Sequence, residues 1–368
     1  MTTIPLVDLA AQHAEIADEV GLGLADVFAR TAFVGGREVD DFEREYAAYV
    51  GAAHCVGAAN GTDALELALR AVGVRPGGEV VLPANSFIAT AEAVSRIGAR
   101  PVLVDVDDEH LLIDPEQVAR AIGPHTQAVA PVHLFGQTAF VEQVRAAVGD
   151  AVPIVEDAAQ AQGAQRHGRP AGSLGEAAST SFYPGKNLGA AGDAGAVTTH
   201  DADRARAVRV LAAHGSPSKY VHDVVGMNSR LDTVQAVYLR AKLSRLEKWN
   251  ELRREAALRY AELLDGLPDL RVPRPAAGNR DVWHLYVVRT TDRDGLLGAL
   301  AEAGIGAGVH YPTPIHLTGA YAHLGLGPGS FPVAEQAARR MVSLPMFPHL
   351  TADQQDRVAD AVAAFLRA

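Results

Sequence analysis

One lysine in this sequence lies where it could act as an amine nucleophile. Lys186 follows an apolar stretch, residues 178–183, and between residues 177 and 199 the only other charged side chain is Asp193. A lysine held where water is scarce loses part of its preference for the charged form. Its free amine can then attack a carbonyl and form a Schiff base. A lone lysine is more often a surface residue, so the hypothesis depends on finding the other parts of a site.

Two carboxylates and an amide follow the apolar stretch 151–155, which is typical of a buried strand. Carboxylates at the tip of such a strand need a partner or a function, because burying a charge is costly. Asp157 could pair with the protonated ring nitrogen of a planar cofactor, and Gln160 is close enough in sequence to reach the same ring. Glu156 is instead expected to cap the following helix.

A possible anion site and a possible stacking residue lie earlier in the chain. Residues 54–60 indicate a strand that runs through Gly61 directly into a helix, with Thr62 or Asp63 as its expected N-cap. Such a helix start offers free N–H groups and the positive end of the helix dipole to an anion. Phe87 comes just beyond the predicted strand 79–83, where it could stack on a flat ring. Taken one at a time, these motifs are better explained by a plain capped helix and a core phenylalanine.

The elements that must position these residues alternate between strands and helices, which indicates an α/β fold. Helices are predicted for residues 38–49, 84–96 and 115–121, as well as directly after Gly61. Seven strands are predicted, at residues 54–60, 79–83, 101–105, 127–132, 151–155, 178–183 and 194–199.

After the last of these strands, the sequence predicts a long helical segment and a second domain. Residues 231–264 contain neither glycine nor proline, which predicts a long helical segment with a bend, leading out of the first domain. A second unit follows, so the predicted division is a large domain at 1–249 and a small domain at 250–368. The small domain is expected to contain a strand at 282–288, a strand or loop at 308–312, and helices at 295–303, 333–341 and 353–367.

Composition excludes several classes of protein. The net charge of −11, without a run of Lys or Arg, argues against nucleic-acid binding. One cysteine, Cys55, excludes an intrachain disulfide and suits a reducing cytosol. Residues 1–12 lack the features of a signal peptide, and no stretch is long and apolar enough to span a membrane, so a cytoplasmic protein is expected. The histidines lack metal-ligand spacing and the glycines at 304–308 do not complete a dinucleotide-binding motif, so no metal is predicted.

Four motifs taken together resemble a known family. They are Ser-Phe-Tyr-Pro-Gly-Lys-Asn-Leu-Gly at 181–189, Glu-Asp-Ala-Ala-Gln at 156–160, Gly-Thr-Asp-Ala-Leu at 61–65 and Gly-Met-Asn-Ser-Arg-Leu-Asp at 226–232. In this order they closely resemble the sugar aminotransferases of the DegT/DnrJ type, from about Ile4 to the C-terminus. The chain departs from the family's usual Gly-Asp-Gly-Gly only at Ala194.

The resemblance implies the fold-type-I pyridoxal phosphate (PLP) enzyme fold, which is that of aspartate aminotransferase. Such proteins have a large domain with a mostly parallel seven-stranded sheet and a small C-terminal α+β domain. They form a homodimer that shares two active sites. The family's activity would be the transfer of an amino group from glutamate, by way of pyridoxamine phosphate, to a keto sugar attached to a nucleotide diphosphate.

The resemblance also implies a role for each site residue. Lys186 would bind PLP covalently and later move a proton between substrate and cofactor, while Asp157 would pair with the ring nitrogen. Gln160 would contact the ring hydroxyl and Phe87 would stack on the ring. The residues implied to hold the phosphate are Gly61, Thr62, Ser181 and Asn228 of the partner subunit. Those implied to face the sugar or its diphosphate are Tyr183, His310, Tyr311 and Lys219 of the partner subunit.

The substrate stays open between several alternatives. Tyr183 and Asp193 are more similar to family members that aminate carbon 3 of dTDP-linked 6-deoxyhexoses. Members acting on carbon 4 more often have His and Glu at these two positions. An aminotransferase of keto-cyclitols is a third alternative. A PLP-binding regulatory protein without turnover is a fourth, because a fold does not determine a function.

Overall fold

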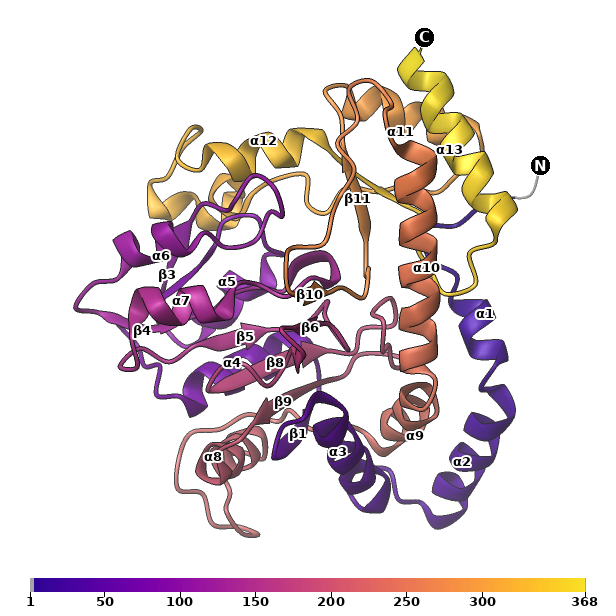
Figure 1. Cartoon of the computed structure of the whole chain (residues 1–368). Helices are drawn as coiled ribbons and strands as arrows, with labels where there is room; N and C mark the ends of the chain where they lie inside the picture. The colour runs from indigo at the N-terminus through magenta and orange to yellow at the C-terminus, as the bar shows by residue number, and fades with distance from the viewer. Residues whose placement is uncertain (1–2, 368) are drawn as a thin grey trace.

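The computed structural model describes residues 3–367. A seven-stranded sheet forms the centre of the larger part (Figure 1). Three strands pair in the order β3-β2-β4 and four in the order β1-β9-β8-β5. Parallel bridges from Val129 to Ile154 and from Val132 to Asp157 join the two groups into one sheet. The strands are β1 His54–Ala58, β2 Glu79–Pro83, β3 Arg100–Val104, β4 Thr126–Val129, β5 Val155–Asp157, β8 Ala177–Ser181 and β9 Gly195–Thr199.

Only β9 runs against its neighbours. It pairs antiparallel with both β1 and β8, whereas β2 pairs parallel with β3 and β4, and β5 pairs parallel with β8. The predicted mostly parallel sheet of seven strands is therefore confirmed. Parallel strands must be covered on both faces, and their sequences here are accordingly continuous apolar runs such as Val80-Val81-Leu82, which is fully buried.

Helices cover this sheet. Helix α4 (Gly61–Ala71) packs against β8 and β9 and lies beside α5 (Ala89–Arg96) and α8 (Ala202–Ala212). Helices α6 (Pro115–Ala121) and α7 (Val141–Val148) pack against one another, and α3 (Arg37–Val50) packs against β1. The apolar faces of α4 and α5 join the buried strands in one large core.

The predicted long helical segment is present with the expected bend. Helix α9 (Thr233–Leu243) is followed by Ser244 as its C-cap, and α10 (Leu246–Leu264) continues along one side of the molecule (Figure 1). The second core forms where α10 packs with β11 (Tyr286–Arg289), β12 (Met341–Leu344), α11 (Arg293–Glu302) and α13 (Ala352–Arg367). Ile4 belongs to this second core, so the first described residues pack with the last third of the chain. The predicted division between residues 249 and 250 falls inside α10 and stays a prediction.

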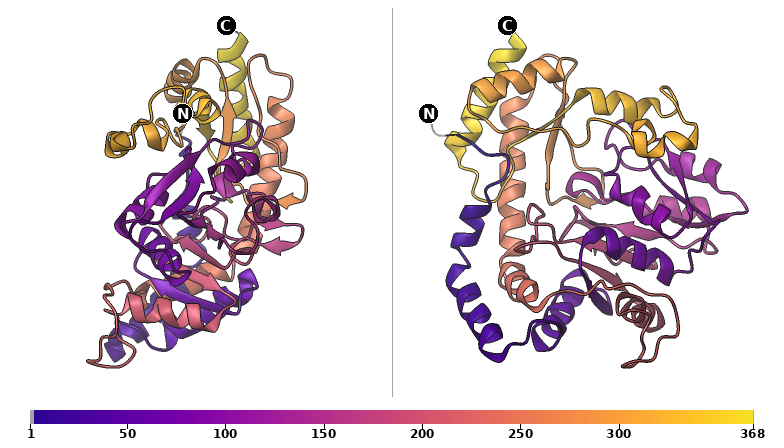
Figure 2. Two further views of the ribbon diagram at one scale, coloured as in Figure 1. Left: turned by 90° about the vertical axis from the view of Figure 1, so that its left-hand side faces the viewer. Right: turned by 180° about the vertical axis from the view of Figure 1, so that it is seen from behind.

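Residues 9–30 form two helices that the patterns above do not predict, α1 (Leu9–Ala14) and α2 (Ala17–Arg30). Ile16 and Val20 from this region pack with Ala241 and Trp249, which fastens the N-terminal helices to α9 and α10 (Figure 2, right). The remaining elements are short or follow the prediction. They are β6 Gln165–Arg166, β7 Arg169–Pro170, β10 Asn279–Arg280, α12 Pro332–Arg340 and three 3-10 turns at Leu134–Gly136, Ile315–Leu317 and Gly319–Leu324.

Two predicted strands differ from the structure. The strand expected at 282–288 begins only at Tyr286, because residues 282–285 bond to the large domain instead. Val282 N–H donates to the carbonyl of Gly136, and Leu285 N–H donates to that of Phe135. The strand expected at 151–155 is likewise displaced toward the C-terminus, to 155–157.

Candidate active site

A cavity of about 650 Å³ opens at the ends of the central strands and collects most of the predicted site. Its wall contains ten of the twelve predicted residues: Gly61, Thr62, Phe87, Asp157, Gln160, Ser181, Tyr183, Lys186, His310 and Tyr311. The other two, Lys219 and Asn228, are not part of this wall. Both belong to the segment after α8, where Asn228 forms a bridge with Ala213. Their expected place in the partner's site stays a prediction.

Lys186 lies half-buried in the wall, directly after β8 and a tight turn. Its N–H donates to the carbonyl of Tyr183 at 2.8 Å. A side chain on Gly189 would lie 2.2 Å from the carbonyl oxygen of Pro184, so the turn closes only with glycine there. Burial lowers the pKa of Lys186 from 10.5 to about 8, although the negative charge of Asp157 opposes this shift. With this pKa, about a tenth of the amine is free at pH 7, which is far more than an ordinary lysine offers as a nucleophile.

The carboxylate of Asp157 lies at the end of β5 and is held in place from two sides. The hydroxyl of Thr90 donates to Oδ2 at 2.8 Å, and the N–H of Ala159 donates to Oδ1 at 3.2 Å. The Thr90 hydroxyl also lies 2.6 Å from that of Ser86. A carboxylate oriented in this way can accept a further hydrogen bond from a cation in the cavity.

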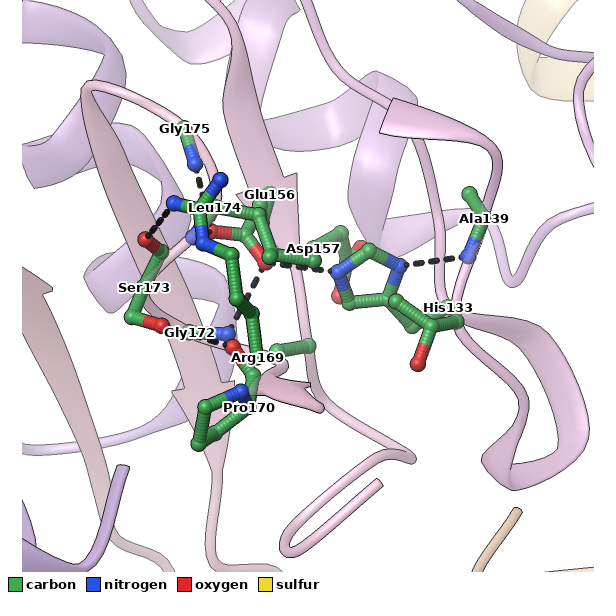
Figure 3. A network of polar contacts seen from close by, with 12 residues as sticks. His133, Ala139, Glu156, Asp157, Arg169, Pro170, Gly172, Ser173, Leu174 and Gly175 are labelled. Atoms are coloured by element: carbon green, nitrogen blue, oxygen red, sulfur yellow. Dashed lines mark hydrogen bonds and ion pairs between the residues drawn. The ribbon is translucent and has the colours of Figure 1, made fainter. Parts of the chain in front are cut away.

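Glu156 is not a helix cap, so that prediction is wrong. No helix begins directly after β5, because residues 158–164 form turns and irregular backbone. The Glu156 side chain is fully buried and accepts hydrogen bonds from the N–H groups of Gly172, Leu174 and Gly175 at 2.7–2.8 Å (Figure 3).

The fourth donor to Glu156 is His133 Nε2, at 2.7 Å. Burial raises the pKa of Glu156, but the hydrogen bonds from His133, Gly172 and Gly175 outweigh it, and the net pKa is lowered. This network fixes the backbone of β5 immediately before Asp157 and so helps to position the carboxylate that faces the cavity.

The start of α4 has free N–H groups that could bind an anion, but its cap differs from the prediction. The N-cap is Asn60, whose Oδ1 accepts from the N–H of Asp63 at 2.8 Å; the predicted caps Thr62 and Asp63 are wrong. The cap is displaced because the helix begins at Gly61 itself. The N–H groups of Gly61 and Thr62 therefore lie in the first turn, where no helical acceptor exists for them. A Cβ on Gly61 would lie 2.5 Å from Ser181 Cβ, so glycine lets the helix approach β8 closely.

Aromatic side chains form another part of the cavity wall. The rings of Phe87 and Tyr311 lie 5.2 Å apart, and Gln160 Nε2 donates to Tyr311 Oη at 3.0 Å. Gln160 Oε1 accepts from the N–H of Phe135 at 2.6 Å, which fixes the amide. Phe87 is 52% exposed and Tyr183 is 59% exposed, so in one chain this side of the cavity is open.

The histidines of the cavity are shifted toward the neutral form. Burial lowers the pKa of His310, and the positive charge of Lys186 lowers it further. His310 Nδ1 lies 2.8 Å from the hydroxyl of Ser343. A neutral imidazole can both donate and accept a hydrogen bond, which suits contact with a hydroxylated ligand.

Sequence reasoning missed several residues of the wall, including Asn60, Ser86, Thr90 and His284. Asn60 had a usable signal, because asparagine directly before a helix start is a preferred N-cap. Thr90 and His284 had none, since their partners Asp157 and Asn187 are distant in sequence.

The site fits pyridoxal phosphate. One cavity holds an amine of lowered pKa, a carboxylate for a ring nitrogen, a helix N-terminus for a phosphate and an exposed aromatic ring. Among residues 3–367 no cluster of His, Cys, Asp or Glu is suited to a metal ion, and none of the helices there could cross a membrane.

The fold and the site define a pyridoxal phosphate-dependent aminotransferase of fold type I. Residues 15–363 match the DegT/DnrJ/EryC1/StrS aminotransferase family, and the chain belongs to this family.

Two relatives and one solved structure illustrate the similarity. The chain is 45% identical to the erythromycin biosynthesis sensory transduction protein EryC1 of Saccharopolyspora erythraea, over 98% of this chain and 99% of that protein. It is also 45% identical to the dTDP-3-amino-3,4,6-trideoxy-alpha-D-glucose transaminase of Streptomyces venezuelae, over 98% and 95% of the two chains. The crystal structure of S. venezuelae DesV in complex with a ketimine intermediate matches with a TM-score of 0.98, at 44% identity over 100% of both chains.

Proposed function

We propose that this protein transfers an amino group from glutamate to carbon 3 of a dTDP-linked 3-keto-6-deoxyhexose, with pyridoxal phosphate as cofactor. The observation that carries the proposal is Lys186, whose amine of lowered pKa shares one cavity with the Asp157 carboxylate and the start of α4. The choice of carbon 3 is supported by the S. venezuelae relative, whose name places the amino group on that carbon.

Each group of wall residues has a distinct task in this proposal. The N–H groups of Gly61 and Thr62, together with Ser181, hold the cofactor phosphate. Asp157 keeps the ring nitrogen protonated, and Phe87 covers the ring. Bound pyridoxal phosphate supplies the electron sink, and the protein supplies binding, orientation and one base. That base would be Lys186, whose amine would accept and return a proton at the reacting carbon of the substrate.

The sugar is expected on the open side of the cavity. Tyr183, His310 and Tyr311 line the cavity and offer hydroxyl and imidazole groups for hydrogen bonds to sugar hydroxyls. Binding of glutamate is supported only by the family's activity, since no residue of the wall is specific to that donor.

A homodimer is part of the proposal. Large apolar side chains are exposed in two regions, Phe28, Phe33 and Val34 around the end of α2, and Tyr220 and Val225 in the segment after α8. Exposed apolar groups of this kind favour protein contacts. The second region also contains Lys219 and Asn228, which we place in the partner's cavity. Size-exclusion chromatography with light scattering should give twice the 38.7 kDa chain mass; a monomer would contradict this arrangement.

A cytoplasmic location and the domain division at 249/250 also belong to the proposal. The lone Cys55 is buried and free, which suits a reducing compartment.

The deciding experiment is a substrate panel. Protein loaded with pyridoxamine phosphate is incubated with 3-keto and 4-keto nucleotide sugars and with keto-cyclitols, and the products are identified by NMR. Amination at carbon 3 is the expected result, and amination at carbon 4 or of a cyclitol would replace the proposed substrate. Turnover of none of them would favour the second candidate, a regulatory protein, which the name of the S. erythraea relative suggests.

A further inference from the structure

His284 lines the same cavity as Lys186 but has no role in the function proposed above. It is 8% exposed and lies in segment 282–285, which bonds to the large domain and leads into β11 of the second core. Bonds from Val282 to Gly136 and from Leu285 to Phe135 fix this segment. A Cβ on Gly136 would lie 2.6 Å from the backbone nitrogen of His284, so the two segments are in close contact.

Within residues 3–367, the His284 side chain has one hydrogen-bond partner, Asn187, which is the residue directly after Lys186. His284 Nδ1 lies 3.2 Å from Asn187 Oδ1. Asn187 is 1% exposed, and its Nδ2 donates at 2.9 Å both to Asn250 Oδ1 and to the carbonyl of Val282.

These two bonds determine the orientation of the Asn187 amide. Asn250 is itself oriented, because its Nδ2 donates to the carbonyl of Gln162 at 2.9 Å and its Oδ1 is therefore the acceptor. A flipped Asn187 amide would place its oxygen against two acceptors, the Asn250 Oδ1 and the Val282 carbonyl. The oxygen of Asn187 must consequently point toward His284.

An amide oxygen only accepts hydrogen bonds, so the proton in this contact belongs to His284 Nδ1. Burial lowers the pKa of His284 well below its usual range, and the positive charges of Lys186 and Arg253 add to this effect. A neutral ring with a proton on Nδ1 has none on Nε2.

We propose that His284 is a positioning residue for Lys186: its Nδ1–H holds the Asn187 amide, and its Nε2 remains an unprotonated acceptor. The peptide after the lysine is then fixed from α10 through Asn250 and from segment 282–285 through His284 and Val282. The lysine side chain can move while its backbone origin stays in place, which is what a group serving first as nucleophile and then as base requires.

The tautomer is tested directly on the protein without any cofactor. Long-range ¹⁵N–¹H correlation spectra of ¹⁵N-histidine-labelled protein distinguish Nδ1–H from Nε2–H rings, and among the 14 histidines the His284 signal is the one missing in a His284 variant. We expect the Nδ1–H pattern. An Nε2–H or doubly protonated pattern at neutral pH would overturn the proposal, whatever reaction the protein catalyses.

A pair of substitutions tests the positioning role, and this arm rests on the proposed function. His284→Asn places an amide donor where Nδ1 lies, whereas His284→Gln carries its amide out to the position of Nε2. We expect His284→Asn to keep kcat within about threefold, and His284→Gln to lower it by at least about tenfold with little change in KM. Equal losses in both variants would refute the positioning role.

Asn187→Leu is the matched test of the second link. It fills the same space without the donors and the acceptor, so it should lose kcat as His284→Gln does. It should also broaden the absorbance band of bound pyridoxal phosphate, because the linked lysine then samples several positions. A normal band and normal kcat in Asn187→Leu would contradict the proposal. If one of the two His284 variants does not fold, the other can still be used to assign the His284 signal. The tautomer seen in the spectrum of the unaltered protein then decides the proposal.

Discussion

At the scale of single residues, the chemistry depends on an amine and a carboxylate that face one cavity. Both could be predicted from the sequence, because each follows an apolar stretch whose burial makes an ionisable group costly. The hydrogen bonds that hold them could not. Thr90 reaches Asp157 across 67 residues. Three of the four donors to Glu156 come from the turn at 172–175, and the fourth is His133.

Replacing the amine should remove both cofactor attachment and turnover. Lys186→Ala leaves no nucleophile in the cavity, so the visible absorbance band of lysine-linked pyridoxal phosphate should disappear and transamination should cease. Lys186→Arg, which keeps a cation but not a nucleophile, is the control for charge. Retention of the band or of transamination in either variant would reject the assigned role.

Replacing the carboxylate should leave a folded but slow enzyme. Asp157→Asn keeps the size of the side chain and an acceptor for Thr90, but it cannot hold a proton on the ring nitrogen. We expect kcat to fall by roughly 10²–10³-fold without loss of the circular-dichroism melting transition. Near-normal rates would show that the ring nitrogen is not paired with Asp157.

At the scale of elements, the start of α4 shows how a difference of two or three residues in a helix boundary changes the site. The sequence indicated the strand, the glycine and the helix in their correct order. It did not show that Asn60 caps the helix, which leaves the first N–H groups free for an anion. Segment 282–285 is similar: its apolar pattern predicts a strand, but the bonds to Phe135 and Gly136 determine its path.

Adding one methyl group at this helix start should weaken cofactor binding. In Gly61→Ala the new Cβ would lie 2.5 Å from Ser181 Cβ, so the helix start must move away from β8. We expect the Kd for pyridoxal phosphate, measured by absorbance titration, to rise by at least about tenfold. Gly21→Ala is the control, because a Cβ there has no atom within 4 Å. Similar affinities in both variants would argue against this phosphate site.

At the scale of the whole molecule, the division into two cores followed from the long glycine-free segment, whereas the attachment of the N-terminal helices to it did not. Lys242 of α9 is 2% exposed, lies over the ring of Trp249, and donates to the carbonyl of Gly189 in the turn after Lys186. Burial, together with the positive charge of Arg253, lowers the pKa of Lys242 to about 8.

This buried cation predicts how global stability depends on pH. Below pH 8 Lys242 is protonated in both states and its burial destabilises the fold. Between pH 8 and 10.5 the folded state releases the proton while the unfolded state keeps it, so stability rises by up to about 1.4 kcal/mol per pH unit from this group. Urea unfolding should show a smaller rise for Lys242→Met than for the exposed control Lys248→Met. If stability rose equally with pH in both variants, Lys242 would not be the group responsible for the rise.

The pairing of Ile4 with Ile305, and of the Leu6 carbonyl with the N–H of Met346, has a consequence for synthesis. Leu6 and Val7 form part of the cavity wall, yet their partners leave the ribosome last. We expect the nascent protein to complete the seven-stranded sheet while this wall is still missing. Cofactor capture would then be a late, post-translational event, and ribosome-bound chains arrested before residue 305 would hold pyridoxal phosphate poorly.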